Sequence, residues 1–472
     1  MKTKFYLSLV AMVFAALTAS AAETPDFWYN FNNNNLAYKI TDASLATVRV
    51  VRPTNTGYSD LGGVLTIPEV VYNNGNAYTV TEIGDGAFDG QKTITAVVIP
   101  KSVKSIGRQG FYNCMALKTV TFQNASQSAL EEIDVFAFEF DRELTSVTLP
   151  QSVKTIKGGA FQSCSKLTSV TLPNGLTTLG EYVFQNCSSL RSINIPTKIQ
   201  VLEREVFAAC KSLTSITIPS NIKSIGFRVF RDCTGLTSVT IPSTVSERLF
   251  AANGSPIYGN WFEGCTGLTS VNIQNSFITS GEFYGCTNLK TVNIGSNVTF
   301  VSDSLVYYSP VPFKDCPIET LNVGSNAAAN IAYYPNARST LKTLNLTNGV
   351  TDLPESAFEG CSVLTTATLP KTLDGMGNAA FSGCTKMREL TAKMERPFAI
   401  DASVFSGVQQ HGYCDLHVPK GSSGRYKAME VWKEFYVIDE AAGPSSIRGD
   451  VNSDGQVTIA DVVAVLNIMA GN

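Results

Sequence analysis

The chain has 472 residues and a small excess of acidic residues, which argues against some classes of function. Its 36 lysine and arginine residues stand against 39 aspartate and glutamate residues, so there is no surplus of positive charge for sequence-independent nucleic-acid binding. The only histidines are His411 and His417. A mechanism that needs a histidine base or a three-histidine metal site therefore has almost nothing to work with.

The first residues predict an export signal. Lys2 and Lys4 precede an apolar run over residues 5–17, and small residues at positions 19–22 offer a cleavage site. The apolar run is shorter than the roughly 20 residues that a membrane-spanning helix needs. We therefore expect a signal peptide over residues 1–22, with an uncleaved anchor as the alternative. The mature protein is then secreted or at the cell surface, and peripheral to a membrane at most.

Residues 23–76 are expected to form a β-rich N-terminal cap. Runs that alternate apolar and polar residues, such as 37–40 and 46–51, are separated by turns rich in asparagine and glycine. Alternation of this kind is typical of half-buried strands. The segment precedes an array of repeats, and the open end of such an array has to be covered.

Residues 77–413 repeat a unit of about 23 residues. Each unit contains a phenylalanine, often a cysteine three positions later, and then a strand-like run such as Ser-Val-Thr-Leu-Pro at 169–173. A second apolar pair, such as Val153 and Ile156, precedes the next phenylalanine. The cysteines at the constant interval are Cys164, Cys187, Cys210 and Cys233, and then Cys361 and Cys384. The phenylalanines in phase are Phe88, Phe111, Phe138, Phe161, Phe184, Phe207, Phe230, Phe262, Phe283, Phe313, Phe358 and Phe381.

One such unit cannot bury its own apolar face, but stacked units can. We therefore predict a repeat solenoid with a parallel sheet that takes one short strand from each repeat. Turns and short helical pieces are expected behind the sheet, with the phenylalanine and cysteine columns inside.

The 11 cysteines allow two interpretations. An even set in an exported protein would favour disulfides, whereas this set is odd and recurs once per repeat. Asp141 and Arg338 occupy the cysteine position of their repeats without changing the phase. These observations favour free thiols in the core over disulfides between neighbouring repeats, and they give no support to a zinc site.

The repeat resembles a known family. The pattern Leu-x-x-Val-x-Ile-Pro, then Ile-Gly, then Ala-Phe-x-x-Cys is similar to the BspA-like leucine-rich repeats of bacterial surface and secreted proteins. Residues 84–88 (Gly-Asp-Gly-Ala-Phe) and 157–164 (Lys-Gly-Gly-Ala-Phe-Gln-Ser-Cys) carry the similarity, which extends over roughly residues 63–437. The resemblance implies a leucine-rich-repeat right-handed superhelix and a role in adhesion to host proteins or other cells.

Insertions mark one candidate binding region. The interval from Phe230 to Phe262 is 32 residues and that from Phe283 to Phe313 is 30 residues, and the interval from Phe313 to Phe358, which spans two units, contains an irregular stretch at 327–334. Insertions in a solenoid emerge on one side. Tyrosine and tryptophan dominate binding hot spots. One hypothesis is a shared contact patch for a ligand, and the equally supported alternative is packing beneath their own loops. The aromatic residues concerned are Tyr258, Trp261, Tyr307, Tyr308, Tyr333 and Tyr334.

The outward positions of the strands form a second candidate surface, which is polar and almost uncharged. It could bind an extended protein or a glycan through many weak hydrogen bonds, although a solvated strand surface is the more ordinary interpretation. These positions include Ser169, Thr171, Ser192, Asn194, Ser215, Thr217, Ser270, Asn272, Thr291, Asn293, Thr343 and Asn345.

Residues 414–440 are expected to form the C-terminal cap. Residues 416–419 predict the last strand and residues 425–432 predict a short helix. Both histidines are interpreted as structural. Apolar groups that would close the end of the core are Tyr426, Met429, Trp432 and Phe435.

A linker over residues 441–448 leads to a small module at 449–472. Its loop has oxygen ligands at positions 1, 3 and 5, glycine at position 6 and a carboxylate at position 12, which matches an EF-hand calcium loop. The predicted Ca²⁺ ligands are Asp450, Asn452, Asp454, Gln456, Thr458 and Asp461. The segment resembles one half of a dockerin, which implies Ile459 and Ala460 as a recognition pair for a cohesin-like partner. A full dockerin has two such halves, so cohesin binding is in doubt.

No motif for catalysis stands out, and no insert is large enough to wall a deep cleft. The sequence therefore favours a non-enzymatic, adhesin-like protein that recognises a host or neighbouring-cell protein or glycan through its repeats. The alternative is a non-catalytic scaffold subunit of a polysaccharide-degrading assembly, docked through its C-terminal module.

Overall fold

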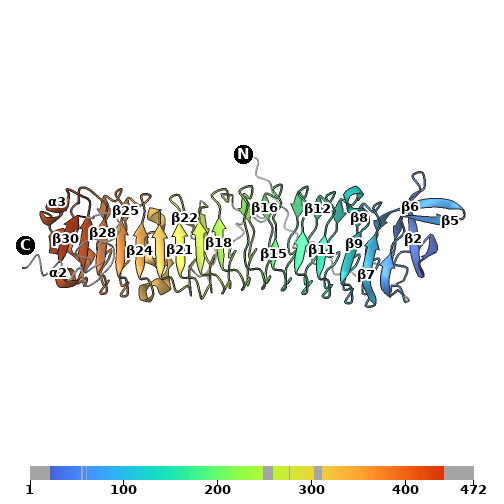
Figure 1. The fold of residues 1–472 in the computed structure, drawn as a ribbon, viewed down its shortest axis with the longest axis horizontal. Coiled ribbons are helices and arrows are strands. Elements are labelled where there is room, and N and C mark those ends of the chain that lie inside the picture. The colour runs from blue at the N-terminus through green and yellow to red at the C-terminus, as the bar shows by residue number, and fades with distance from the viewer. Residues whose placement is uncertain are drawn as a thin grey trace, which may run out of the picture. The chain divides into compact units, whose positions relative to one another are not determined.

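The computed structural model describes residues 22–54, 57–59, 61–247, 259–275, 277–301 and 311–440. The chain divides into two compact units, one comprising Met1–Ile318 with Ala332–Asn336 and the other Glu319–Ile331 with Ala337–Asn472. Both are built as parallel-sheet β-solenoids, with about 15 turns in all. Figure 1 shows their short strands as arrows side by side.

The first unit begins with antiparallel strands. Strand β1 (Phe27–Phe31) pairs with β2 (Asn34–Asp42), and β2 pairs with β3 (Thr47–Val50). Strand β3 then runs parallel to β6 (Asn76–Ile83), which also forms a hairpin with β5 (Val70–Asn73). The β-rich character expected for this segment is therefore present, and β1 stands at the end of its sheet.

Most repeats of the first unit contribute two strands rather than the one predicted. The main strands form a six-stranded sheet, and the second strands continue the sheet that starts at β1. Ile156 explains the second strand: it is fully buried, and its neighbour Thr155 pairs with the equivalent residues one turn away on either side. The main strands are β4 (Gly63–Thr66), β7 (Ile94–Ile99), β9 (Thr119–Phe122), β11 (Ser146–Thr148), β13 (Ser169–Thr171) and β15 (Ser192–Ile193). The second strands are β8 (Ser105–Ile106), β10 (Glu132–Ile133), β12 (Thr155–Ile156) and β14 (Thr178–Leu179).

The remaining strands of the first unit occupy the same two places in the repeat, as main strands or as second strands. Strand β16 (Val201–Leu202) pairs with β17 (Ser224–Ile225), and β20 (Phe277–Thr279) pairs with β22 (Thr299–Val301). The main strands here are β18 (Ser238–Ile241), β19 (Ser270–Ile273) and β21 (Thr291–Ile294), which pair in that order. A 3₁₀ turn, η1 (Ala125–Gln127), lies between β9 and β10.

The second unit has six main strands in chain order, all parallel. They are β23 (Thr320–Val323), β24 (Thr343–Leu346), β26 (Thr366–Leu369), β28 (Glu389–Ala392), β29 (Asp415–Val418) and β30 (Val437–Glu440). Second strands β25 (Asp352–Leu353) and β27 (Gly375–Met376) pair with each other. The short helical pieces are η2 (Asn326–Ala328), η3 (Ile331–Tyr333), η4 (Pro335–Ser339), η5 (Ala402–Phe405), α2 (Gln410–Tyr413), α3 (Ser423–Lys427) and η6 (Trp432–Glu434).

A column of stacked phenylalanine rings forms the centre of the first unit. From Phe88 to Phe313 each ring lies 5.0–5.9 Å from the next, with interplanar angles of 3–15°. Tyr58 begins the column and Tyr334 ends it. In the second unit Phe358, Phe381 and Phe405 stack in the same way. The predicted phenylalanine column is confirmed.

The cysteines form a second internal column. All 11 are free and buried, as favoured from the sequence. The thiol of Cys187 donates to the carbonyl oxygen of Phe161 at 3.2 Å, and most other cysteines repeat this bond to a phenylalanine of the preceding turn. Burial raises the pKa of the Cys187 and Cys233 thiols to about 12. They are therefore neutral packing residues and poor nucleophiles at neutral pH.

Left-handed backbone shapes the turns around the phenylalanine column. Tyr182 and Asn186, two positions before and two after Phe184, both have φ of 61°. Glycine stands at the equivalent positions in other turns, as at Gly159 (φ 65°) and Gly383 (φ 76°). The left-handed region carries a steric penalty for residues with a Cβ. Two such left-handed positions bend the chain in most turns, at the place where other solenoids can have an extended helix.

The C-terminal end is covered by aromatic residues, but its strands differ from the prediction. Strand β30 follows β29, so 416–419 is not the last strand, and the helix α3 is only five residues long. Tyr426 and Trp432 are fully buried and lie edge-to-face at 5.4 Å, and Phe435 is also buried. The hydroxyl of Tyr426 donates to the carbonyl oxygen of Met394 at 2.8 Å, and the indole N–H of Trp432 donates to the carbonyl oxygen of Phe398 at 2.9 Å.

Candidate functional site

The outward side of the main strands is the broadest regular surface of each unit. We call it the strand face and define it by the side chains that alternate with the buried residues of these strands. In β13, Ser169 and Thr171 are exposed while Val170 between them is buried. Parallel pairing places Ser169 beside Ser146 and Ser192 of the adjacent turns. Each outward position therefore becomes a straight column of like side chains.

Asparagines on the strand face are joined by side-chain hydrogen bonds. The amide of Asn293 donates to the amide oxygen of Asn272 at 2.5 Å, and Asn272 donates to the hydroxyl of Thr240 at 3.3 Å. In the second unit Asn345 donates to Asn322 at 2.7 Å. An amide has two N–H donors and two acceptor lone pairs, and the bond to its neighbour fixes the orientation of each of these side chains.

The strand face carries little charge over most of its length. The outward columns of β11, β13 and β15 hold serine and threonine, and those of β18, β19 and β21 hold serine, threonine and asparagine. Charges appear in the last turns of the second unit, where Glu389 pairs with Asp415 in register and Thr391 pairs with His417. The imidazole Nδ1 of His417 lies 2.6 Å from the carboxylate of Asp439, which supports the structural role expected for this histidine.

A shallow depression of about 240 Å³ opens beside the strand face of the second unit. Its lining includes Asn345 and Thr368, both outward strand residues, and Lys393. The remaining lining residues are Leu346, Thr347, Asn348 and Pro370. It is smaller than the roughly 300–1,000 Å³ of typical small-molecule sites. It is better suited to one polar group of a larger ligand.

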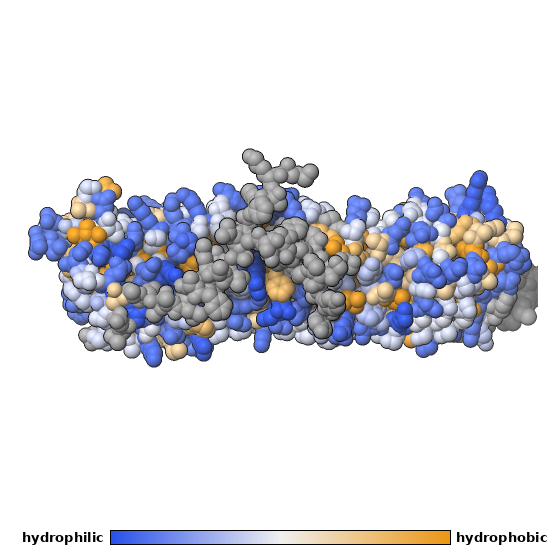
Figure 2. All heavy atoms as spheres, turned by 180° about the vertical axis from the view of Figure 1, so that it is seen from behind, coloured by the Kyte–Doolittle hydropathy of each residue, from blue (hydrophilic) through white to orange (hydrophobic). Residues whose placement is uncertain are grey.

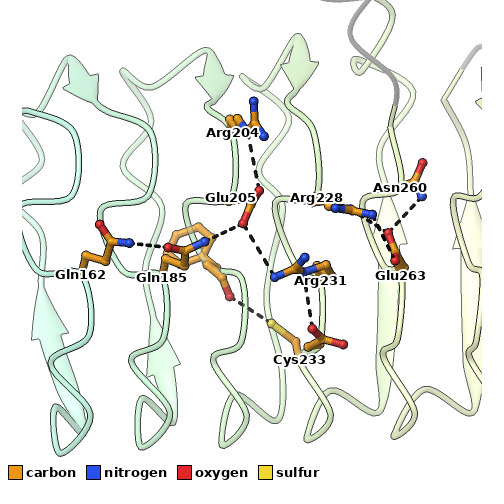
Figure 3. A network of polar contacts seen from close by, with 11 residues as sticks. Gln162, Gln185, Arg204, Glu205, Arg228, Arg231, Cys233, Asn260 and Glu263 are labelled. Atoms are coloured by element: carbon orange, nitrogen blue, oxygen red, sulfur yellow. Dashed lines mark hydrogen bonds and ion pairs between the residues drawn. The ribbon is translucent and has the colours of Figure 1, made fainter. Parts of the chain in front are cut away.

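A polar network crosses several turns around the phenylalanine column (Figure 3). Gln162 donates to Gln185 at 2.5 Å, and Gln185 donates to the carboxylate of Glu205, also at 2.5 Å. Arg231 and Arg204 approach the same carboxylate at 3.9 and 3.6 Å. Glu205 is 6% exposed, whereas the side chains of its partners Arg204 and Arg231 are partly exposed.

The network continues to the following turns in the same manner. Arg228 makes two hydrogen bonds to the carboxylate of Glu263, at 2.8 and 3.3 Å, and Asn260 donates to it at 3.0 Å. The Arg228 guanidinium also lies 4.7 Å from the ring of Phe227, in cation–π contact. These charges are paired with one another, so the network stabilises the stacking of turns and offers less to a ligand than the strand face does.

On the side of the molecule shown in Figure 2, hydrophobic residues form separate patches between hydrophilic ones. Large hydrophobic side chains that are exposed include Trp28 (47%), Leu45, Val64, Val70 and Tyr72 (54%) of the first unit. These five belong to the N-terminal segment rather than to the regular repeats.

The aromatic residues of the insertions do not form one surface patch. Trp261 is 2% exposed and packs edge-to-face on Phe277 at 6.0 Å, and Tyr334 is fully buried. For these two the prediction of a ligand contact is wrong, because each ring completes the core: Tyr334 stacks on Phe313 at 5.0 Å as the last member of the phenylalanine column. Tyr333 is half-buried and stacks on Phe300 at 4.0 Å. Tyr258, Tyr307 and Tyr308 lie outside the described residues.

The predicted calcium ligands and the predicted recognition pair Ile459 and Ala460 also lie outside the described residues, as do the predicted linker and residues 1–21 of the predicted signal peptide. Among the residues that are described, no group of three or more His, Cys, Asp or Glu side chains could hold a metal ion. No helix of that part of the chain has the length and apolar character of a membrane span.

Several carboxyl groups have raised pKa values, and Glu282, one of the most buried of them, is structural. Burial raises the pKa of Glu282 to about 8. Its carboxyl oxygens accept hydrogen bonds from the backbone amide of Trp261 at 3.2 Å and from the hydroxyl of Thr279 at 3.1 Å. The Trp261 amide belongs to the preceding turn and Thr279 to the turn of Glu282 itself, so Glu282 joins two turns beside an insertion. It was not identified from the sequence. A buried glutamate has no distinguishing local pattern.

The profile of the BspA type Leucine rich repeat region matches residues 76–139, 131–255, 212–335 and 309–411, in six copies. These matches cover most of the chain, which therefore belongs to the BspA-type leucine-rich-repeat family. The family consists of repeat solenoids, and no enzyme family is indicated. No curated protein matches the chain significantly.

Several solved structures have chains similar to this one. A leucine-rich repeat protein from Bacteroides ovatus is 26% identical, with 77% of this chain and 94% of that chain covered and a TM-score of 0.43. A leucine rich cell surface protein from Faecalibacterium prausnitzii is 25% identical, with 86% and 98% covered and a TM-score of 0.45. The pneumococcal vaccine antigen PcpA is 18% identical, with 90% and 100% covered and a TM-score of 0.39.

Proposed function

We propose that this chain is an exported, non-enzymatic binding protein of the adhesin type, which recognises a host or neighbouring-cell protein or glycan through its strand face. The observation that carries the proposal is the row of uncharged, oriented polar side chains on that face. The donation from Asn293 to Asn272 at 2.5 Å and its equivalent between Asn345 and Asn322 hold the amides in place before any ligand arrives.

The stiffness of the backbone supports this choice of surface. Within each sheet the neighbouring main strands are joined in register, and the column of phenylalanine rings beneath them is continuous from Phe88 to Phe313 in the first unit. A preformed surface loses little conformational entropy on binding, so many weak hydrogen bonds can add up to useful affinity. Family membership and the N-terminal sequence pattern support a location outside the cytoplasmic membrane.

The test is a charge placed on the strand face. The mature chain is screened against a glycan array and a panel of purified extracellular proteins, and each hit is measured again with Asn272→Glu and Asn293→Glu combined. Binding through the strand face should fall by roughly tenfold or more, because each unpaired carboxylate has to be desolvated against the ligand. Thr287→Glu is the matched control, because Thr287 is exposed in the same turn as Asn293 but lies off the strand face. Equal binding by both variants would remove the strand face as the site.

The C-terminal sequence motif supports a second candidate function. A non-catalytic subunit of a polysaccharide-degrading assembly would dock through residues 449–472, with Ile459 and Ala460 at the contact. Deletion of 449–472 would then abolish capture by a cohesin-like module and leave ligand binding by the repeats intact. Adhesion through the strand face predicts that this deletion leaves the main binding activity unchanged.

A further inference from the structure

A cleft of about 550 Å³ opens in the N-terminal part of the first unit, away from the regular repeats. It lies between the β1–β2 hairpin and the segment that follows β3; β2 is labelled in Figure 1. Its volume falls in the range of about 300–1,000 Å³ typical of small-molecule sites. The lining residues are Trp28, Asn33, Asn35, Pro53, Thr54, Gly57, Tyr58, Ser59 and Leu61.

Trp28 provides an aromatic surface in this cleft that the fold itself does not need. Its side chain remains 47% exposed, whereas the other two tryptophans, Trp261 and Trp432, are 2% and 0% exposed. The indole lies edge-to-face on Tyr58 at 6.2 Å, with an interplanar angle of 89°. Tyr58 is itself fixed, because its hydroxyl donates to the carbonyl oxygen of Val51 at 2.7 Å and accepts from the amide of Ala37 at 3.1 Å. The indole of Trp28 is thus packed against Tyr58 and is otherwise open to solvent.

Polar groups gather around this ring from the same hairpin. Trp28 pairs in register with Ala37, and two residues along each strand Asn30 pairs with Asn35, so these four residues share one face of the hairpin. Asn35 is exposed, and Asn33 in the turn of the hairpin is exposed as well. Carboxamides can both donate and accept hydrogen bonds, which suits them to hydroxyl groups.

The opposite wall of the cleft is held in place by hydrogen bonds. The amide of Gly57 donates to the carbonyl oxygen of Thr54 at 2.9 Å, and the hydroxyl of Thr54 donates back to the carbonyl oxygen of Gly57 at 2.8 Å. Gln91 donates to the carbonyl oxygen of Tyr58 at 3.1 Å. Gly57 has φ of 75° and lies close to Gln91, so a side chain there would be strained and crowded. Both walls are therefore formed without a ligand.

The chemistry of the lining selects one class of ligand. None of the nine lining residues among the described part of the chain is charged, and the adjacent Arg52 is 8% exposed and paired with Asp89 at 2.5 Å. An anionic ligand would find no free cation among the lining residues. A pyranose ring has an apolar C–H face that packs on an indole and hydroxyl groups that bond to carboxamides. We propose that this cleft binds a neutral saccharide, with the sugar ring on Trp28 and its hydroxyls on Asn33 and Asn35. The site is separate from the strand face and does not depend on its function.

Tryptophan fluorescence tests the proposal directly, because Trp28 is the one exposed residue among three tryptophans. The mature chain is titrated with neutral oligosaccharides built from glucose, mannose, galactose, fucose or N-acetylglucosamine, and emission and acrylamide quenching are recorded. At least one oligosaccharide should saturate a shift in emission and protect Trp28 from acrylamide. Trp28→Ala should weaken that binding by roughly tenfold or more in calorimetry, as expected for an aromatic anchor.

Two further variants keep the result interpretable. Asn35→Ala should weaken binding by a smaller factor with no change in the thermal unfolding midpoint, because the side chain is exposed and makes its contact only with the ligand. Tyr72→Ala removes another exposed aromatic residue, on β5 outside the cleft, and should leave binding unchanged. The proposal is overturned if no oligosaccharide protects Trp28 at roughly 10 mM, a concentration that detects even weak sites. It is also overturned if Trp28→Ala binds as well as the parent chain.

Discussion

The backbone amide of Cys114 donates a hydrogen bond of 2.7 Å to a carboxyl oxygen of Asp141, which stands where most other repeats have a cysteine. Asp141 is fully buried, and the burial raises its pKa well above the ordinary value. Its second carboxyl oxygen makes no hydrogen bond within the described residues. The Asp141 side chain accepts this hydrogen bond as a cysteine sulfur would. Unlike the sulfur, however, its carboxylate form is destabilised by the loss of solvent around it.

Asp141→Cys should therefore stabilise the protein at neutral pH. Since the pKa of Asp141 is raised in the folded state, its contribution to stability is fully present below its unfolded pKa of about 3.9 and is lost as the pH rises. The gain in the free energy of unfolding should be about 1–3 kcal/mol near pH 7 and smaller at pH 4. Denaturant unfolding of the parent and the variant at both pH values measures the difference. Asp141→Asn serves as a control that removes the charge alone, and a gain that does not vary with pH would contradict the mechanism.

Left-handed turn positions occupied by residues other than glycine should be improved by glycine. Ala209 has φ of 59°, so Ala209→Gly relieves a steric cost and should raise the free energy of unfolding by about 0.5–1 kcal/mol. Its neighbour Ala208 is fully buried and is not among the residues with positive φ, so Ala208→Gly should destabilise instead. Urea unfolding of the two variants compares adjacent residues of one turn. Stabilisation by both, or by neither, would show that backbone conformation does not control these positions.

The phenylalanine column should dominate the stability of its unit. Phe184 is fully buried between Phe161 and Phe207, with ring centroids 5.7 and 5.9 Å away, so Phe184→Ala should cost about 3–5 kcal/mol. Because each repeat contacts its neighbours, hydrogen exchange should increase most in the turns beside the substitution. Tyr72→Ala, at a side chain that is 54% exposed, should cost less than about 1 kcal/mol. Equal losses from the two substitutions would argue against the column as the main source of stability.

The C-terminal loop should bind one calcium ion per chain. Calorimetry of the mature chain should show one site with a dissociation constant between about 10⁻⁷ and 10⁻³ M, the range of EF-hand loops. Asp450→Ala combined with Asp454→Ala removes two of the predicted ligands and should abolish the heat. Calcium binding that survives this double substitution would place the ion elsewhere, and no heat at millimolar calcium would remove the predicted site.

Much of the fold could be predicted from the repeat alone. The phenylalanine and cysteine columns follow from spacing, because residues at one interval must meet when identical units stack. The main strands follow from alternation, as Ser169, Val170 and Thr171 show with their exposed, buried and exposed side chains. The strand face was a candidate from the same alternation. All of these depend on the order of residues within one unit and the period between units.

Other features were decided only when the units packed together. Two-residue strands such as β12 are too short to be identified as strands from their apolar residue alone, and they form because both neighbouring turns pair with them. Tyr334 occupies the end of the phenylalanine column because the chain brings its ring onto Phe313, which no local pattern indicates. The cleft at Trp28 depends on Tyr58, 30 positions away, whose two hydrogen bonds to Val51 and Ala37 hold it beneath the indole. Period and alternation are local properties and can be derived from the sequence, whereas contacts between segments of unequal spacing are determined by the tertiary structure.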